Sequence, residues 1–451
     1  MNIYRSYFEK NNTIVKNSEL NSAKNQVTEI AYGGKEKTFS KFLFKLDLSG
    51  LKNKIETREI TQDKINSHIL YLKNTINLVK NYNIFYNNQK RATDFNLILF
   101  KINEDWAEGN GHDILLNNIQ SISERDKNTS ASNWVYKKTN EEWSTNGIVD
   151  INNIEIIDTI HFDNGDEDFV ADITTYVNDI LYTSGSVDYG LGISFPLDFE
   201  NLIDDYIKSI NFHTKYTNTF FEPYLETLFD NIIQDDRSCF HLDVDNRLYF
   251  YAKRNTTFYN INILNVNIYD DNDELLFTYD SNMINKHSKG VYYIDINLSS
   301  ETNTDSIIYR DDWIFEDHNG DIKTISNTFY IMSDILRQEI QNNLTKVKIF
   351  GIYNNKIIKR GEILNVDFNF NSIFNSFVNY CDYRFVYDLH VKYGDNPVYI
   401  IKDHNVNKVP NKYFISFDTE IFVPNTYYLT VNLYYLDNIV NSKTINFKIV
   451  D

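Results

Sequence analysis

The sequence predicts an all-β chain: an N-terminal jelly roll or β-sandwich, then two immunoglobulin-like β-sandwiches, with few short helices. Apolar and polar residues alternate with a period of two along much of the 451 residues, as in strands with one buried face. The 33 Tyr and 31 Phe fit half-buried pleated surfaces. Turns rich in Asn and Asp separate many short strands at regular spacing, which is typical of sandwiches and barrels.

Five stretches combine this alternation with aromatic or branched residues, and we expect each of them to be a core strand. They are residues 42–48, 95–102, 247–251, 292–296 and 427–434.

Helical patterns are short and local. Asp172 can cap a helix that runs to residue 181. A second helix is predicted at 199–210, after Pro196, and a third at 333–341, where apolar residues share one face.

Polar runs at 231–238 and 341–343 interrupt the strand pattern and suggest domain boundaries. We therefore predict a jelly roll at 1–232 and immunoglobulin-like sandwiches at 233–343 and 344–451. The last two segments have the usual size of such sandwiches.

The net charge of −19 excludes several classes of partner. Neutralising phosphates needs a Lys/Arg surface, and no stretch supplies one, so we expect no direct nucleic-acid or anionic-membrane partner. The two cysteines, Cys239 and Cys381, are too few and too distant for a disulfide framework, and buried thiols are expected. No signal-peptide core and no membrane-length apolar run is found, so we expect a soluble chain made in a cytoplasm.

Residues 101–113 (KINEDWAEGNGHD) hold four carboxylates, a Trp, two Gly and a His, and invite a functional interpretation. A glycosidase needs two carboxylates facing each other across roughly 5 to 9 Å. Glu104, Asp105, Glu108 and Asp113 lie on one strand-to-loop segment, which does not provide that geometry. We predict no catalytic residue here.

Calcium is the alternative for this stretch and for three other acidic turns, because Asp and Asn oxygens around a Gly turn suit a hard cation. The EF-hand spacing is absent from all four, and a hairpin tip explains each more simply. A calcium ion at one of them stays open, with no ligand set assigned. The other three turns are residues 163–168, 270–274 and 316–321.

No His/Cys ligand set, nucleophile elbow or phosphate-binding loop is present, so no zinc, metal or cofactor-binding residue is predicted. Gly190 and Gly192 within a strand-like run indicate a bulge or a close backbone approach. Trp106, Trp134 and Trp143 could form a sugar-stacking platform, but packing in the core and under its covering loops is the favoured interpretation.

The first segment also resembles the disaggregatase-related (DNRLRE), carbohydrate-binding-module-like jelly rolls. Residues 42–51 (FLFKLDLSGL) are similar to the family's RFDLSGLP strand, and residues 103–109 (NEDWAEG) to its W-x-E-G stretch. A second Trp follows at Trp134, residues 170–177 (VADITTYV) resemble D-V-T-x-W/Y-V, and residues 189–193 match the closing strand. An insertion at 121–140 displaces the family's second Trp site, and its sugar-binding residues cannot be mapped. The resemblance thus implies the fold and no particular ligand.

The layout of the whole chain, a jelly roll followed by two sandwiches, resembles virion structural proteins of tailed bacteriophages. The bias toward Asn, Ile, Lys and Tyr is typical of an AT-rich genome, which suits the crAss-like group. The resemblance rests on the order of residues 4–11, 220–224, 312–313 and 412–419. It implies a non-catalytic subunit that assembles in several copies in a tail or neck ring or collar of the virion, built in the host cytoplasm. Its partners would be copies of itself in a cyclic homo-oligomer and other virion proteins. A carbohydrate-binding or adhesin-like surface protein, with a glycan as partner, is the alternative, and an enzyme is the least favoured reading.

Overall fold

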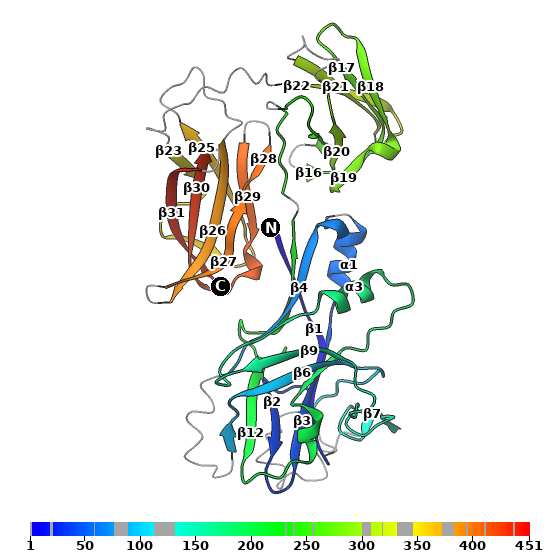
Figure 1. The fold of residues 1–451 in the computed structure, drawn as a ribbon, viewed down its shortest axis with the longest axis vertical. Coiled ribbons are helices and arrows are strands. Elements are labelled where there is room, and N and C mark those ends of the chain that lie inside the picture. Colours follow the sequence, from blue (N-terminus) through cyan, green and yellow to red (C-terminus); the bar gives the residue numbers. More distant parts are fainter. Residues whose placement is uncertain are drawn as a thin grey trace. The chain divides into compact units, whose positions relative to one another are not determined.

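The computed structural model consists mainly of strands, with two short α-helices in the described residues, α1 (Ser49–Glu56) and α3 (Thr174–Tyr182) (Figure 1). The all-β fold class is therefore confirmed. No described helix is long and apolar enough to cross a membrane. The described residues are 2–18, 21–57, 59–75, 89–111, 131–230, 232–237, 240–254, 257–299, 308–317, 319–331, 346–371, 383–393, 396–409, 412–435 and 438–451.

The chain divides into two compact units. The N-terminal unit comprises Ile3–Asn53 and Asn66–Leu228, and the C-terminal unit comprises Met1–Asn2, Lys54–Ile65 and Phe229–Asp451. The division into domains at 1–232, 233–343 and 344–451 stays a prediction, and the second of its boundaries lies outside the described residues.

The N-terminal unit is built on eleven strands folded into layers. Its main path runs β10-β4-β13-β1-β3-β11-β6-β9, while β2 joins β3 and β12 pairs with β2 and β5. Phe162 of β9 meets Phe169 of β10 and Phe212 of β12, with ring centroids 6.4 and 6.2 Å apart. This aromatic contact joins the layers in one core. The strands are β1 (Asn2–Val15), β2 (Val27–Gly33), β3 (Thr38–Leu46), β4 (Ile65–Leu72), β5 (Gln89–Arg91), β6 (Phe95–Lys101), β9 (Ile156–Phe162), β10 (Phe169–Asp172), β11 (Leu191–Ser194), β12 (Ile207–His213) and β13 (Tyr224–Phe229).

The C-terminal unit begins with the central sandwich, whose sheets have the orders β14-β20-β19 and β18-β17-β21-β22. Its core is apolar and aromatic, and the stacked rings of Phe250 and Trp313 lie 5.0 Å apart within it. Its strands are β14 (Asn246–Tyr251), β17 (Asn262–Tyr269), β18 (Leu275–Asp280), β19 (Asn285–Ser288), β20 (Val291–Ile296), β21 (Ile308–Glu316) and β22 (Ile322–Tyr330), and β15 (Lys253–Arg254) pairs with β16 (Thr257–Phe258).

The C-terminal sandwich follows, with sheets of order β23-β25-β29-β28 and β24-β31-β30-β26-β27. The inward residues of β30 alternate strictly with half-exposed ones, as expected for a sheet with one covered face. The strands are β23 (Lys346–Phe350), β24 (Lys356–Lys359), β25 (Ile363–Asn371), β26 (Tyr383–Tyr393), β27 (Asn396–Asn405), β28 (Asn407–Val409), β29 (Lys412–Asp418), β30 (Asn425–Tyr435) and β31 (Asn438–Val450).

All five core strands predicted from alternation are present, as β3, β6, β14, β20 and β30. The helix at 172–181 is confirmed as α3, whereas the helix at 199–210 is wrong. A single short turn of 3₁₀ helix (Leu197–Asn201) gives way to β12, because pairing with β2 fixes residues 207–213 as a strand. The predicted helix at 333–341, Cys239 and Cys381 lie outside the described residues.

Candidate functional site: the capped face of the N-terminal unit

One face of the N-terminal sheet is buried although it lies opposite the face on which Phe8 packs with Phe42 and Phe44. Phe42 of β3 packs near Phe8, so its neighbours Lys41 and Leu43 face the opposite way. Leu43 is paired with Gly192, which is paired in turn with Phe100. Lys41, Leu43 and Phe100 are nevertheless fully buried. We call this outward side of β3, β11 and β6 the capped face, because loop residues cover it.

Lys41 shows what covers the capped face. Its Nζ donates to the carbonyl oxygens of Gly147 and Val149 at 2.7 and 3.1 Å. It also lies 5.1 Å from the ring centroid of Trp134 and 3.9 Å from a carboxylate oxygen of Glu200. Burial lowers the pKa of Lys41 to about 8, against the opposing pull of Glu200. The lysine thus ties the covering loop to the sheet.

The three candidate tryptophans lie in this covering region and are buried, with exposures of 2%, 4% and 4% for Trp106, Trp134 and Trp143. The indole N–H of Trp106 donates to the Tyr189 carbonyl at 2.8 Å, and that of Trp143 donates to the Asn133 carbonyl at 2.9 Å. Buried indoles with satisfied N–H groups present no open ring face for a sugar. Any role of these rings in ligand binding stays a prediction.

The carboxylates of Glu104, Asp105 and Glu108 are each held by a lysine. Glu104 accepts from Lys137 at 2.8 Å, and Asp105 accepts from Lys138 at 2.6 Å. The hydrogen bond from Lys138, with the charge of Lys10, holds the pKa of Asp105 below its usual value. The pKa of Glu104 is also lowered, by hydrogen bonds from Lys137 and Ser144 that outweigh its burial, so these two carboxylates hold the segment in place as ionised groups rather than as general acids.

Glu108 fastens the same segment to strand β1 and to more distant residues. Its two carboxylate oxygens accept from the backbone N–H of Asn11 at 2.9 Å, from Lys24 at 3.0 Å and from the hydroxyl of Tyr216 at 2.9 Å. Three donors satisfy most of its accepting capacity. For Glu108 to bind a sugar beside Trp106, these hydrogen bonds would have to break.

The two glycines of this stretch shape the turn around Asn21. Gly109 has φ +89°, and a Cβ on Gly111 would lie 1.6 Å from the Asn21 carbonyl oxygen. The Asn21 side chain accepts from the Gly111 N–H at 2.8 Å and donates to the Glu108 carbonyl at 2.7 Å. Neither glycine can carry a side chain here without moving the backbone. His112 and Asp113, which end the stretch, lie outside the described residues.

The other acidic turns use their carboxylates to close the turn. Asp270 accepts from the N–H groups of Asn272 and Glu274 at the tip of the β17–β18 hairpin. Asp317 does the same for Asn319 and Asp321 between β21 and β22. Hairpin tips are therefore confirmed at these two turns. At residues 163–168 the hairpin tip is wrong, because the flanking strands β9 and β10 pair with β6 and β4 and not with each other. In the described part of the chain, no group of three His, Cys, Asp or Glu residues is placed to hold a metal.

A second buried polar group, not expected from the sequence, lies in the C-terminal unit. Arg237 has its guanidinium 3.5 Å from Asp235 and 3.6 Å from Asp311, and both carboxylates are nearly inaccessible. Asp311 accepts from the Trp313 indole at 2.8 Å, and Asp235 accepts from the Tyr251 hydroxyl at 2.9 Å. Burial raises the pKa of Asp311 to about 6 although Arg237 opposes it, and also raises that of Asp235. We call these three residues the acid–arginine cluster.

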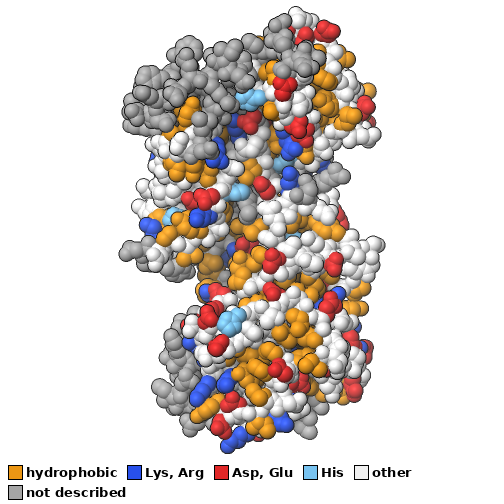
Figure 2. Space-filling model, viewed as in Figure 1, with side chains coloured by type: hydrophobic (Ala, Val, Ile, Leu, Met, Phe, Trp, Pro, Cys, Tyr) orange, Lys and Arg blue, Asp and Glu red, His pale blue; other side chains and the backbone are white. Residues whose placement is uncertain are grey.

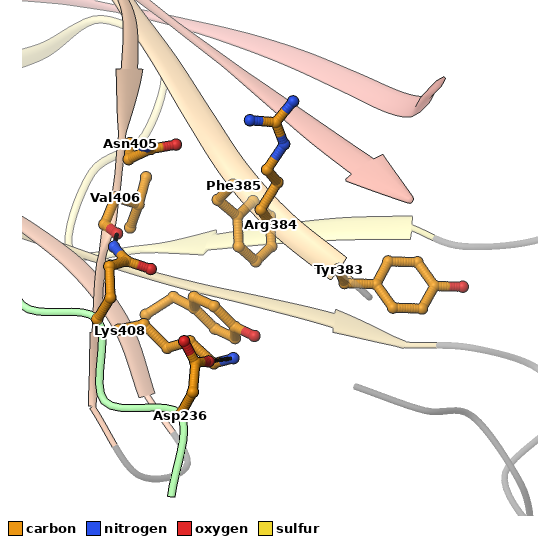
Figure 3. Close-up of a pocket in the computed structure, with 9 residues that line it drawn as sticks. Asp236, Tyr383, Arg384, Phe385, Asn405, Val406 and Lys408 are labelled. Carbon is orange, nitrogen blue, oxygen red and sulfur yellow. Dashed lines mark hydrogen bonds and ion pairs between the residues drawn. The ribbon is translucent and has the colours of Figure 1, made fainter. Parts of the chain in front are cut away.

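A small hollow lies beside the strand that carries Lys408. It has a volume of about 120 Å³ and is lined by Phe385, Val406 and neighbouring side chains. Figure 3 shows Asp236 approaching Lys408, with which it forms an ion pair, while the Arg384 guanidinium points away. Ligand pockets usually measure roughly 300–1,000 Å³, so the hollow is too small for a sugar or cofactor.

No protein-family model and no curated protein matches the chain. Solved structures that align with it include fibronectin(III)-like modules of Clostridium thermocellum CbhA, with 11% identity, 48% of this chain and 90% of that chain covered, and a TM-score of 0.17. A DUF4785 family protein from Legionella pneumophila aligns at 11% identity over 97% and 93% of the two chains, with a TM-score of 0.18. A calcium-stabilised adhesin with which an Antarctic bacterium binds ice aligns at 9% identity over 64% and 63%, with a TM-score of 0.15. The β-sandwich assignment rests on the strand pairing described above.

Proposed function

We propose that the chain is a non-catalytic structural subunit that assembles with copies of itself, as in a tail or neck ring of a bacteriophage virion. The observation that carries the self-assembly is the apolar character of two edge strands. Ile322 and Ile325 of β22 are 69% and 43% exposed, and Val398 and Tyr399 of β27 are 48% and 45% exposed. Both strands stand at the end of their sheet order.

Edge strands offer unpaired backbone groups, and exposed apolar side chains beside them favour contact with another chain. Contacts between unlike surfaces of identical subunits close into a ring when the rotation between neighbours permits. The virion assignment itself rests on the resemblance of the chain layout to tail proteins. The absence of a catalytic role is part of the same proposal and is supported by the lysine-bound carboxylates of Glu104, Asp105 and Glu108.

The test is the assembly state of the full chain. Light scattering after size exclusion, followed by negative-stain electron microscopy, should show a closed oligomer with cyclic symmetry. Cryo-electron microscopy of the source particle should then place several copies around one axis. A strictly monomeric chain at all accessible concentrations would refute self-assembly, and its absence from purified particles would refute the virion assignment.

A carbohydrate-binding or adhesin-like protein remains the second candidate. It would need an open aromatic surface, and the three tryptophans first considered for it are buried. A glycan array probed with the full chain tests it directly, and binding that survives replacement of Trp106 would place the glycan site elsewhere.

A further inference from the structure

Charge is distributed unevenly along this acidic chain. Residues 346–451 contain 12 Lys or Arg and 10 Asp or Glu, whereas the whole chain contains 44 and 63. The C-terminal sandwich is therefore slightly cationic, and residues 1–345 carry all of the negative excess. Such an asymmetry favours head-to-tail contact between copies over contact between like surfaces.

The outer face of the sheet β24-β31-β30-β26-β27 carries a continuous row of rings. Strand register places His390 opposite both Tyr399 and Tyr428, and Tyr428 opposite Asn446. The His390 ring lies 5.4 Å from that of Tyr399 and 5.5 Å from that of Tyr428. The three rings lie side by side on β27, β26 and β30; Tyr399 is 45% exposed, whereas His390 between its two neighbours is 7% exposed.

Cations surround this row. Lys392 lies 4.5 Å from the ring centroid of Tyr428, and Lys402 lies 5.4 Å from that of Tyr399. Among the described residues, neither lysine is ion-paired with a carboxylate, and the same holds for Lys448, which is paired in register with Thr426. The exposed charged residues on or beside this face are the cations Lys359, Arg384, Lys392, Lys402 and Lys448 and the anion Asp403, and Asp388 adds a half-exposed anion.

Apolar groups complete the face. Ile357, paired with Lys448, is 67% exposed, and Ile439, paired with Tyr434, is 55% exposed. Figure 2 shows Lys, Arg and His side chains, with some acidic ones, interspersed among hydrophobic side chains over β26 and β27. Aromatic and apolar groups within a polar rim are the composition of a protein–protein interface.

We propose that the outer face of this sheet docks on the acidic surface of residues 1–345 of a second copy of the chain. Charge complementarity identifies the binding partner of this face as a second copy, because each copy has one cationic face and a much larger acidic surface. This inference rests on the proposed self-assembly and names the surface that mediates it. Contact between two different surfaces is heterologous, which is the arrangement that a closed ring requires.

The experiment uses the full chain with Lys392→Glu and Lys448→Glu combined, in sedimentation velocity at about 50 mM and 500 mM NaCl, a range over which screening of exposed charges increases strongly. The wild-type oligomer should weaken at the higher salt. The variant should show at least a tenfold weaker association at low salt. The control combines Lys253→Glu and Lys348→Glu, two exposed lysines off this face, and changes the net charge equally. It should associate as the wild type does.

The outcomes separate the two proposals. If the wild type associates and the face variant associates equally well, this inference is overturned and self-assembly stands. If the control weakens as much as the face variant, net charge rather than the face is responsible, and the inference again fails. If no form associates, the proposed self-assembly fails with it. An anionic polysaccharide that binds the wild type as a monomer, and not the face variant, would replace the second copy as the occupant.

Discussion

The acid–arginine cluster predicts a specific pH dependence of stability. Asp311 and Asp235 share one guanidinium, that of Arg237, so one negative charge is left buried without full compensation. The pKa of Asp311 is raised to about 6 from 3.8 in the unfolded chain. That difference of about two units corresponds to about 3 kcal/mol at neutral pH. Because the folded state holds the proton between these two pKa values, stability increases as the pH falls through this window.

Asp311→Asn removes the titration while keeping an oxygen acceptor for the Trp313 indole. The free energy of local unfolding can be followed by amide exchange of β21 and β14 in the full chain from pH 4 to pH 8. Relative to the variant, the wild type should gain up to about 3 kcal/mol on acidification across this range, because only the wild type takes up the proton. A difference between the two proteins that does not change with pH would refute the reasoning.

Three further predictions concern the capped face, each measured by urea unfolding. Gly192→Ala would place a Cβ 2.3 Å from the Phe100 ring, so we expect a loss of about 1–3 kcal/mol, partly recovered by adding Phe100→Leu; full stability of the single variant would contradict this. Trp106→Ala should lower the free energy of unfolding by about 3–5 kcal/mol, since it opens a cavity and leaves the Tyr189 carbonyl without its donor. An unchanged stability would contradict the buried position and favour a ring exposed at the surface. Lys41→Met should remove a pH dependence of the free energy of unfolding. Because the pKa of Lys41 is about 8 in the folded state and 10.5 in the unfolded state, the wild type should gain about 3 kcal/mol of stability over the variant between pH 8 and pH 10.5. Parallel curves of stability against pH for the two proteins would disprove this assignment.

Local patterns predicted strand β30 well because it has one buried face, and they also found β3 and β6, which are buried on both faces. The strands predicted at 427–434 and 247–251 are observed as β30 (Asn425–Tyr435) and β14 (Asn246–Tyr251), with bounds that differ by at most two residues. Gly190 illustrates the same success at a single position: its φ is +102°, and a Cβ would lie 2.2 Å from the Phe44 carbonyl oxygen, which is the close approach predicted. Helix α1 was missed, although Asp47 accepts from the Ser49 N–H at 3.0 Å in the manner of a cap, because its sequence continues a strand pattern.

By itself the sequence determined the all-β class, most strand positions and the hairpin tips at 270–274 and 316–321, because these depend on side-chain period and turn chemistry within a few residues. Only the tertiary structure decided what the polar and aromatic candidates do. Lys41 occupies an outward position in its strand and has the pattern of an exposed residue until a loop a hundred residues away covers it. Glu104, Asp105 and Glu108 became anchors for the same reason: their lysine partners come from distant segments, and no local pattern encodes contacts made across such separations.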